Sequence, residues 1–280
     1  MADFPRTRIE DLSVSRLLMG TNWWLGFSHT SAAKDDQIKR TMTPERIADI
    51  MEVFLNAGVD GLIGHPDEKL LAAIDIAQDR TGRRIIALGT PHFDLSRAPD
   101  ADGNSRRAID ACAEMGCRVC MPHQQTTDAL LDRRARVIRD MDRYAAMIRE
   151  AGMIPGLSTH MPEAPVYADE TGLDCQTYIQ IYNAAGFLMQ IEVDWVHRMI
   201  WQRKKPVITI KPLAVNKVLP LVGLAFNWST IRDRDMVCVG TSTPDEAREV
   251  IEISLSLLER RMSQVELQKT RSKASVVPKT

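Results

Sequence analysis

Short apolar runs alternate with longer helix-like segments along nearly the whole chain, and glycine closes most of the helix-like segments. Gly58, Gly82, Gly116, Gly152 and Gly186 recur at intervals of 24 to 36 residues. That spacing is typical of a strand followed by a helix, and repeated strand–helix units build parallel sheets. Eight such units close into a (β/α)8 TIM barrel, and 280 residues suit one barrel domain. A doubly wound open sheet is the alternative, although it seldom holds eight evenly spaced units.

The same alternation predicts where the elements lie. Strands are expected over 16–22, 61–65, 84–90, 117–121, 153–157, 187–193, 207–211 and 236–240. Helices are expected over 43–58, 67–82, 105–116 and 131–152, in a segment ending near Gly186, and over 243–262. Thr43 is expected to cap the first helix, with Pro44 at its first position. We therefore divide the chain into one barrel domain (1–262) and a polar, basic tail (263–280). The tail is interpreted as solvated, or alternatively as an arm that contacts another subunit of a homo-oligomer.

Composition and charge restrict the class of partner. The 36 Lys and Arg residues nearly balance 37 Asp and Glu, so no global field favours nucleic acid or an anionic membrane. The charged N-terminus has no apolar segment of the kind that directs export, and no apolar run approaches the 18 residues typical of a membrane span. The five cysteines, which include the pair Cys117 and Cys120, are interpreted as reduced core thiols. A cytoplasmic protein with a small-molecule substrate is the resulting expectation.

Four of the six histidines follow predicted strands. His65, His92, His123 and His160 come after the second, third, fourth and fifth apolar runs. Because the carboxyl ends of barrel strands open onto one face, these side chains are expected to meet in one pocket. A single histidine at a strand end is most often a hydrogen-bonded wall residue. Four such histidines in successive strand–helix units make a shared functional site as plausible as four separate wall residues.

Histidines together with a carboxylate are typical of a metal site. Neutral imidazoles and a carboxylate suit Zn, Mn or Fe, and three ligands leave positions open for substrate. We predict His123, His160 and Glu192 as ligands, with Glu192 inside the strand expected over 187–193. His123, Glu192 and Lys211 are the predicted catalytic residues. Lys211 could satisfy Glu192, act as a base or hold an anionic group.

The segment after the first predicted strand is long for a strand-to-helix connection. Residues 23–42 separate that strand from the first helix, and loops of this length often act as lids. Asn22, Trp23, Trp24 and His29 would offer apolar surface beside hydrogen-bonding groups, which suits a carbohydrate-like substrate. The alternative is that one tryptophan belongs to the core. The predicted substrate-binding residues are completed by His65, His92 and Gln190.

A second candidate binding region precedes the last helix. Gly240, Thr241 and Ser242 stand between an apolar strand and Pro244, and backbone N–H groups there could bind an anion. The alternative is a helix cap with nothing bound. Arg248 is the nearest cation and lies one turn into the helix.

Several of these stretches resemble the aldo-keto reductase superfamily. The resemblance rests on Leu17-Leu-Met-Gly-Thr, on the helix 45–58, on Gly156-Leu-Ser-Thr-His and on the strand ends 210–213 and 239–246. It implies a (β/α)8 barrel and places dinucleotide phosphates at Gly240 to Ser242, with NADP(H) as cofactor. The hydride chemistry of that family uses an Asp, a Tyr, a Lys and a His. Only the histidine has a counterpart here, His123, since Ile63 stands about where the aspartate is expected and 87–91 holds no lysine.

A carbonyl reduction needs a proton donor beside the carbonyl oxygen, and the missing tyrosine and lysine supply it in that family. The leading hypothesis is therefore a barrel that keeps the fold and performs lyase, isomerase or hydrolase chemistry, with metal assistance. A nicotinamide-dependent reductase that uses His123 as the acid is the first alternative. A catalytically inactive, ligand-binding regulatory barrel is the second.

Overall fold

A ring of short parallel strands forms the centre of the molecule. The computed structural model describes residues 3–96, 98–268, 270–274 and 276. The ring contains β3 (Leu17–Gly20), β4 (Gly61–Gly64), β5 (Ile86–Gly89), β6 (Val119–Cys120), β9 (Ile154–Pro155), β10 (Leu157–Ser158), β11 (Tyr178–Ile181), β12 (Val207–Ile210) and β13 (Met236–Gly240). Hydrogen bonds join them in parallel in the order β10-β11-β12-β13-β3-β4-β5-β6-β9. Only Gly156 separates β9 from β10, so the two ends of this order meet and the ring closes as a (β/α)8 barrel.

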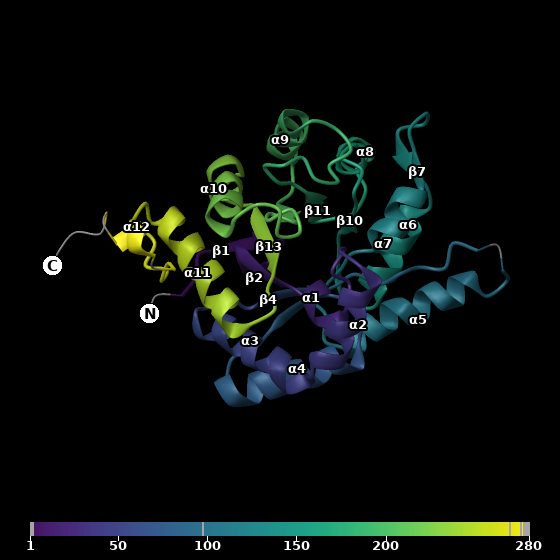
Figure 1. The fold of residues 1–280 in the computed structure, drawn as a ribbon. Coiled ribbons are helices and arrows are strands. Elements are labelled where there is room, and N and C mark those ends of the chain that lie inside the picture. The colour runs from purple at the N-terminus through teal and green to yellow at the C-terminus, as the bar shows by residue number, and fades with distance from the viewer. Residues whose placement is uncertain (1–2, 97, 269, 275, 277–280) are drawn as a thin grey trace.

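Helices follow the strands and surround them (Figure 1). They are α3 (Pro44–Asn56), α4 (Glu68–Thr81), α5 (Ala101–Glu114), α6 (Gln124–Ala129), α7 (Met141–Glu150), α8 (Ala164–Thr171), α9 (Val193–Gln202), α10 (Pro220–Thr230), α11 (Pro244–Leu258) and α12 (Arg271–Ala274). Thr43, Asp67 and Thr243 each accept a backbone N–H at the start of α3, α4 and α11. The cap predicted at Thr43 is confirmed. No helix of the described residues is long and apolar enough to cross a membrane.

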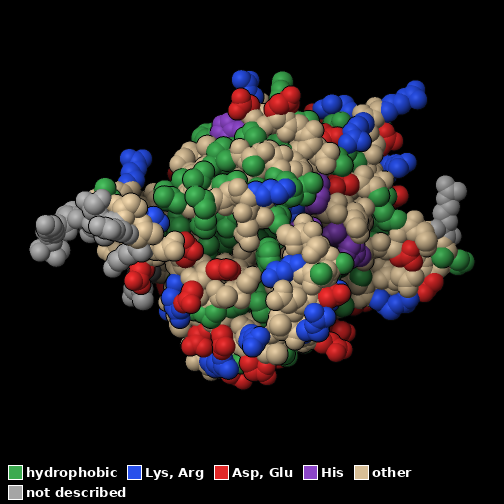
Figure 2. All heavy atoms as spheres, in the orientation of Figure 1, with side chains coloured by type: hydrophobic (Ala, Val, Ile, Leu, Met, Phe, Trp, Pro, Cys, Tyr) green, Lys and Arg blue, Asp and Glu red, His purple; other side chains and the backbone are tan. Residues whose placement is uncertain are grey.

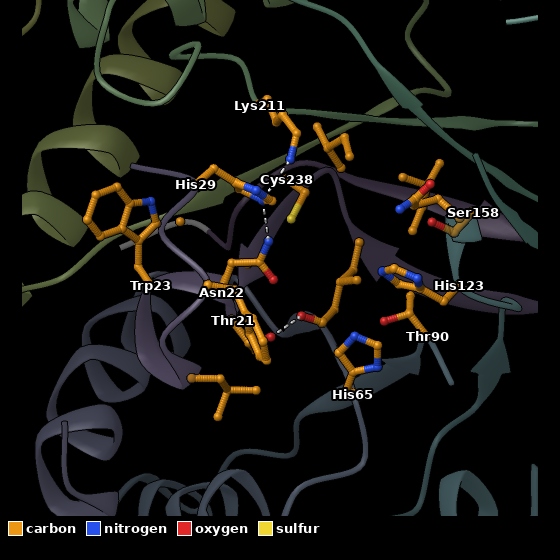
Figure 3. Close-up of a pocket in the computed structure, with 18 of the residues that line it drawn as sticks. Thr21, Asn22, Trp23, His29, His65, Thr90, His123, Ser158, Lys211 and Cys238 are labelled. Carbon is orange, nitrogen blue, oxygen red and sulfur yellow. Dashed lines mark hydrogen bonds between the residues drawn. The ribbon is translucent and has the colours of Figure 1, made fainter. Parts of the chain in front are cut away.

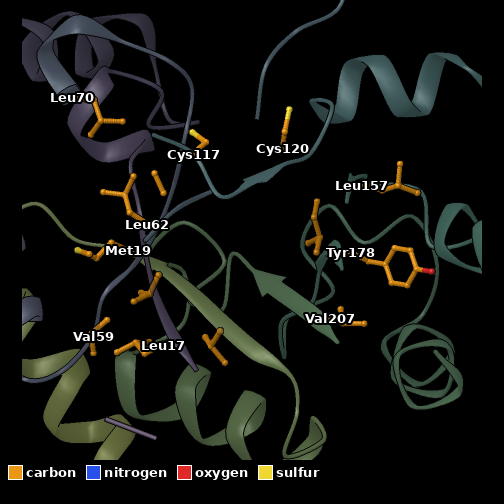
Figure 4. Close-up of a cluster of buried hydrophobic side chains, with 14 of the residues drawn as sticks. Leu17, Met19, Val59, Leu62, Leu70, Cys117, Cys120, Leu157, Tyr178 and Val207 are labelled. Carbon is orange, nitrogen blue, oxygen red and sulfur yellow. The ribbon is translucent and has the colours of Figure 1, made fainter. Parts of the chain in front are cut away.

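The core has an inner and an outer part because successive strand residues face opposite sides of the ring. Leu17 and Met19 of β3 belong to the outer cluster, which packs the strands against the helices and is drawn in part in Figure 4. Leu18, between them, belongs to the inner cluster. An N-terminal antiparallel hairpin of β1 (Arg6–Ile9) and β2 (Leu12–Ser15) contributes Ile9 and Val14 to that inner cluster. The hairpin therefore fills the barrel interior from the end opposite the strands' carboxyl termini.

The sixth strand lies earlier in the chain than predicted. Residues 187–193 form no strand. The strand is β11, Tyr178–Ile181, all of which is buried. Leu188 and Gln190 instead have positive φ, and Leu188 and Ile191 are exposed. The prediction was wrong because Leu188 and Ile191, which are exposed in a turn, give this run the apolar composition of a buried strand.

The predicted helix over 131–152 is also divided. A small hairpin, β7 (Leu131–Asp132) and β8 (Val137–Ile138), precedes α7. The Asp132 carboxylate accepts the N–H groups of Arg134 and Ala135, which favours a turn over a helix at this point. The connection between β3 and α3 is long, as predicted, and contains α1 (Asn22–Leu25) and α2 (Ala32–Thr41). The division of the chain at 262 stays a prediction, and residues 269, 275 and 277–280 of the predicted tail lie outside the described residues.

Candidate active site

A cavity of about 760 Å³ opens at the carboxyl end of the barrel strands. Side chains from the ends of β3, β4, β5, β6, β10, β12 and β13 line it, and Figure 3 shows them converging from several sides. This is the end of a (β/α)8 barrel at which catalytic groups lie. The prediction that His65, His92, His123 and His160 share one pocket is confirmed, since all four line this cavity.

Three of these histidines form a compact cluster. His65, His92 and His123 follow β4, β5 and β6, and one ring nitrogen of each lies within 4.8 Å of those of the other two. The ring centroids of His92 and His123 are 3.9 Å apart, and those of His65 and His92 are 4.7 Å apart. Histidine side chains are visible in a hollow of the surface in Figure 2. Among the described residues this is the group of three whose ligand atoms could share one metal ion.

The surroundings keep these imidazoles uncharged. Burial, reinforced by the neighbouring His92, lowers the pKa of His65 to about 4. Burial, then His92 and His65, lowers the pKa of His123 to about 3. Burial also lowers the pKa of His92. A neutral imidazole has the free lone pair that a metal ligand needs, so the donor set fits Zn²⁺ or a similar divalent ion.

One hydrogen bond in the cluster limits how such an ion could bind. The Nδ1 atom of His123 accepts the backbone N–H of Gln125 at 3.3 Å. In the neutral ring the proton then lies on Nε2. An ion at Nε2 therefore requires the proton to move to Nδ1 and this long hydrogen bond to break.

Lys211 lies on another side of the cavity and contacts His29. The Nζ atom of Lys211 lies 3.1 Å from Nε2 of His29, and the amide nitrogen of Asn22 lies 3.3 Å from the same Nε2 (Figure 3). An amide nitrogen can only donate, so this Nε2 is an acceptor and Lys211 also donates to it. Burial lowers the pKa of Lys211 to about 8. Burial, then Lys211, also lowers the pKa of His29.

His160 completes the polar lining near Lys211. Its backbone N–H donates to Asp128, whose carboxylate also accepts the Thr159 hydroxyl. Burial, then Lys211 and His29, lowers the pKa of His160 to about 4. The imidazole of His160 is therefore neutral near pH 7, and it does not belong to the three-histidine cluster.

Two members of the metal set predicted from sequence lie outside the three-histidine cluster. His123 belongs to the cluster, but its partners there are His65 and His92, and His160 is not among them. Glu192 precedes α9 as an exposed residue and does not line the cavity. Gln190, also exposed, does not line it either. The predictions that placed Glu192 and Gln190 in the site both follow from placing the sixth strand at 187–193.

The two tryptophans of the long connection have different surroundings. Trp23 lines the cavity, and its indole lies so close to Gly240 that a Cβ there would come within 2.8 Å of it. Trp24 is fully buried, and its Nε1 donates to the carbonyl of Thr241 at 2.7 Å. Trp24 is therefore a core residue, which was the alternative considered for one of the pair.

The strand end that the family resemblance assigns to cofactor phosphates is already occupied by protein groups. The N–H of Ser242 donates to Glu246 at 2.6 Å, and Asp245 and Glu246 place two carboxylates in the first turn of α11. Arg248 is paired with Asp245. Gly240 lines the cavity, whereas Thr241 and Ser242 do not. Since carboxylates at a helix N-terminus repel phosphate, the first turn of α11 is unfavourable for a phosphate group. A second cavity of about 370 Å³ nevertheless lies beside Ser242 and Pro244, and the cations Lys34 and Arg46 line it.

Some lining residues were not predicted from the sequence. Phe27, Thr90, Ser158 and Cys238 all face the cavity. Cys238 could have been found from strand alternation, because it lies two residues before Gly240 on β13. It was instead interpreted as a core thiol, and all five cysteines are indeed buried and unpaired. Phe27 lies in the segment that was predicted to offer apolar surface beside the two tryptophans, although it was not among the predicted substrate-binding residues.

Comparison with known proteins supports the fold and does not identify the activity. No family model and no curated protein sequence matches the chain. Among solved structures, a protein from Pseudomonas aeruginosa described as a candidate aldo-keto reductase shares 15% identity at a TM-score of 0.67, over 92% of this chain and 98% of that one. An aldose reductase from Giardia lamblia shares 12% sequence identity at a TM-score of 0.56, over 98% of this chain and 92% of that one. A truncated 3-deoxy-D-arabino-heptulosonate 7-phosphate synthase from Thermotoga maritima shares 8% at 0.54, over 92% of each chain. The chain thus shares the (β/α)8 barrel fold of these enzymes.

Proposed function

We propose that this protein is a metal-dependent enzyme that holds one divalent ion on His65, His92 and His123. The observation that carries the proposal is the approach of three ring nitrogens to within 4.8 Å of one another at the functional end of the barrel. Three protein ligands leave coordination positions for substrate, as in catalytic rather than structural sites. The substrate is a small polar molecule with a carbonyl or hydroxyl oxygen near the ion.

The reaction class is lyase or isomerase chemistry next to a carbonyl group. When bound, the ion would polarise the substrate oxygen and stabilise negative charge on it. Lys211, on another side of the cavity, supplies positive charge and hydrogen-bond donors. His160 is neutral near pH 7 and lines the same cavity, so it can accept a substrate proton. Trp23 covers one side of the cavity and reduces the access of water.

A nicotinamide-dependent reductase is the second candidate. It is supported by the aldo-keto reductases among the solved structures that share the fold. It is opposed by the cavity, since its described lining residues include no tyrosine to protonate a carbonyl oxygen. It is also opposed by Glu246, whose carboxylate accepts the Ser242 N–H at the strand end where the family resemblance places cofactor phosphates.

Metal analysis and cofactor titration on the same preparation separate the two candidates. We expect the purified chain, reconstituted in turn with Zn²⁺, Mn²⁺ and Fe²⁺ and then desalted, to retain about one ion per chain of at least one metal. The His92→Gln variant should lose that ion. The control, His197→Gln, removes an imidazole that does not line the cavity and should retain it.

NADPH fluorescence should show no saturable binding to the wild type. Retention of the ion by a variant lacking all three clustered histidines would overturn the metal assignment. Tight NADPH binding together with aldehyde reduction would establish the second candidate instead. If the chain binds neither a metal ion nor NADPH and turns over no carbonyl substrate, the non-catalytic, ligand-binding barrel is favoured.

A further inference from the structure

We propose that Lys211, His29 and Asn22 form an anion-binding end of the cavity, so that the substrate carries a permanent oxyanion group, a carboxylate or a phosphate ester. This inference deepens the proposed function and rests on it for the role of the histidine cluster. It assigns the polar substrate two ends: an oxygen-bearing end at the three histidines and an anionic end at Lys211.

The cavity lining carries little negative charge. The titratable groups that line it are Lys211, five histidines, the buried thiol of Cys238 and a single carboxylate, Asp67. The Asp67 carboxylate is exposed and caps α4 by accepting the N–H of Leu70 at 3.0 Å. A divalent ion on three neutral imidazoles would add two positive charges without a carboxylate ligand to compensate them. The occupied cavity therefore needs negative charge, and the ligand is its remaining source.

The ammonium group of Lys211 has an incomplete set of hydrogen-bond partners. An ammonium group has three donors, and the hydrogen bond to His29 uses one. Among the described residues, no carboxylate lies within 4.0 Å of its Nζ. Partly buried charges are normally paired, because removal from water costs several kcal/mol without a partner. An oxyanion would complete the set, and it would reverse the lowering of the Lys211 pKa.

The backbone that presents these groups is strained. Lys211 and His29 have φ values of 59° and 56°, in the left-handed region that most residues avoid. The left-handed conformation continues in the same loop at Ala214, Val215 and Asn216. Val215 and Asn216 also line the cavity. Such strain persists where the surrounding structure over-determines it and clusters at binding sites. Two strained segments from β3–α3 and β12–α10 thus meet at one hydrogen bond inside the cavity.

Binding of three matched small molecules tests the proposal. The probes are pyruvate, dihydroxyacetone and dihydroxyacetone phosphate, which share a ketone and carry a carboxylate, no charge and a phosphate ester. Calorimetry on the metal-reconstituted full chain should show that at least one anionic probe binds about tenfold more tightly than dihydroxyacetone. The anionic probe that is preferred distinguishes a carboxylate from a phosphate ester.

Variants locate the preference. Lys211→Met keeps the length and apolar stem of the side chain and should remove the tenfold preference for the anionic probe over dihydroxyacetone. Lys217→Met is the matched control, because Lys217 is exposed, stacks on Phe187 and does not line the cavity. It should keep the preference. Circular dichroism and a thermal melt establish that both variants are folded.

The outcomes separate this inference from the metal proposal. In chelated protein, and in His92→Gln, a preference that persists and still depends on Lys211 supports the anionic end even if no metal binds. Equal affinities for charged and uncharged probes, or an unchanged preference in Lys211→Met, would overturn it. A preference lost on chelation and untouched by Lys211→Met would assign the anion to the ion instead, and would also overturn it.

Discussion

The two sides of the barrel mouth place their polar side chains in different ways. His65, His92 and His123 come one to three residues after the strands that end at Gly64, Gly89 and Cys120. Lys211 likewise comes one residue after β12, which ends at Ile210, but its backbone is left-handed. Its partner His29 lies in the long helical connection between β3 and α3. The contact between Lys211 and His29 therefore depends on packing between distant segments as well as on barrel closure, so substitutions away from the cavity should disturb it more.

The anchoring of the long connection gives the largest expected effect on stability. Trp24→Ala removes a fully buried indole and its hydrogen bond to Thr241, and should lower the free energy of unfolding by about 3–5 kcal/mol. Trp23→Ala removes a partly exposed ring and should cost much less. Urea denaturation measures both. Equal losses at the two positions would contradict the distinction between a core and a cavity tryptophan.

The histidine side should respond through metal affinity rather than through stability of the apo chain. We expect Ala substitution of His65, His92 or His123 to weaken zinc binding by about 100-fold or more, because a three-ligand site loses one ligand. His160→Ala should change the affinity by less than about threefold, since His160 lies outside the cluster. Competition against a chromophoric chelator gives the constants. A large loss of zinc affinity in His160→Ala would instead support His160 as a metal ligand, as expected from the sequence.

Acid should destabilise the protein, in part through the Lys211 side. The pKa of His160 lies at about 4, below its ordinary value of 6.5. Between those values the unfolded chain binds more protons than the folded one, so the free energy of unfolding falls as the pH drops through this window. His160→Gln should reduce the slope of the unfolding free energy against pH by the contribution of up to about one bound proton per molecule. The slope of unfolding free energy against pH, from urea titrations, checks this, and an unchanged slope would contradict it.

The smallest effect is expected at the start of α11. Glu246→Gln weakens the contact with the Ser242 N–H and removes a favourable charge from a helix N-terminus, so it should cost about 0.5–1 kcal/mol. Asp67→Asn, at the cap of α4 on the histidine side, provides the comparison. A gain of NADPH binding in Glu246→Gln would show that only this carboxylate keeps the cofactor out.

The errors in the sequence analysis occur where local composition is ambiguous. The run 187–193 has the apolar content of a strand, and yet Leu188 and Ile191 are exposed in a turn. The true strand, Tyr178–Ile181, shows its character only by being buried on both faces. Glu192 and Gln190 were consequently placed in a site they do not reach. A one-strand shift of this kind cannot be detected from periodicity, because short apolar runs fit strands, turns and helix starts alike.

The barrel and the convergence of four histidines at one end follow from the sequence pattern alone. Regular strand–helix units can close in few ways, and closure brings every strand end to one face whatever the loops do. Three features depended on tertiary packing: which histidines meet as a group of three, which tryptophan is core, and the contact between Lys211 and His29. Those contacts join residues as far apart as 182 positions through strained backbone. The energies that select them come from packing between distant segments, and single-sequence patterns do not record it.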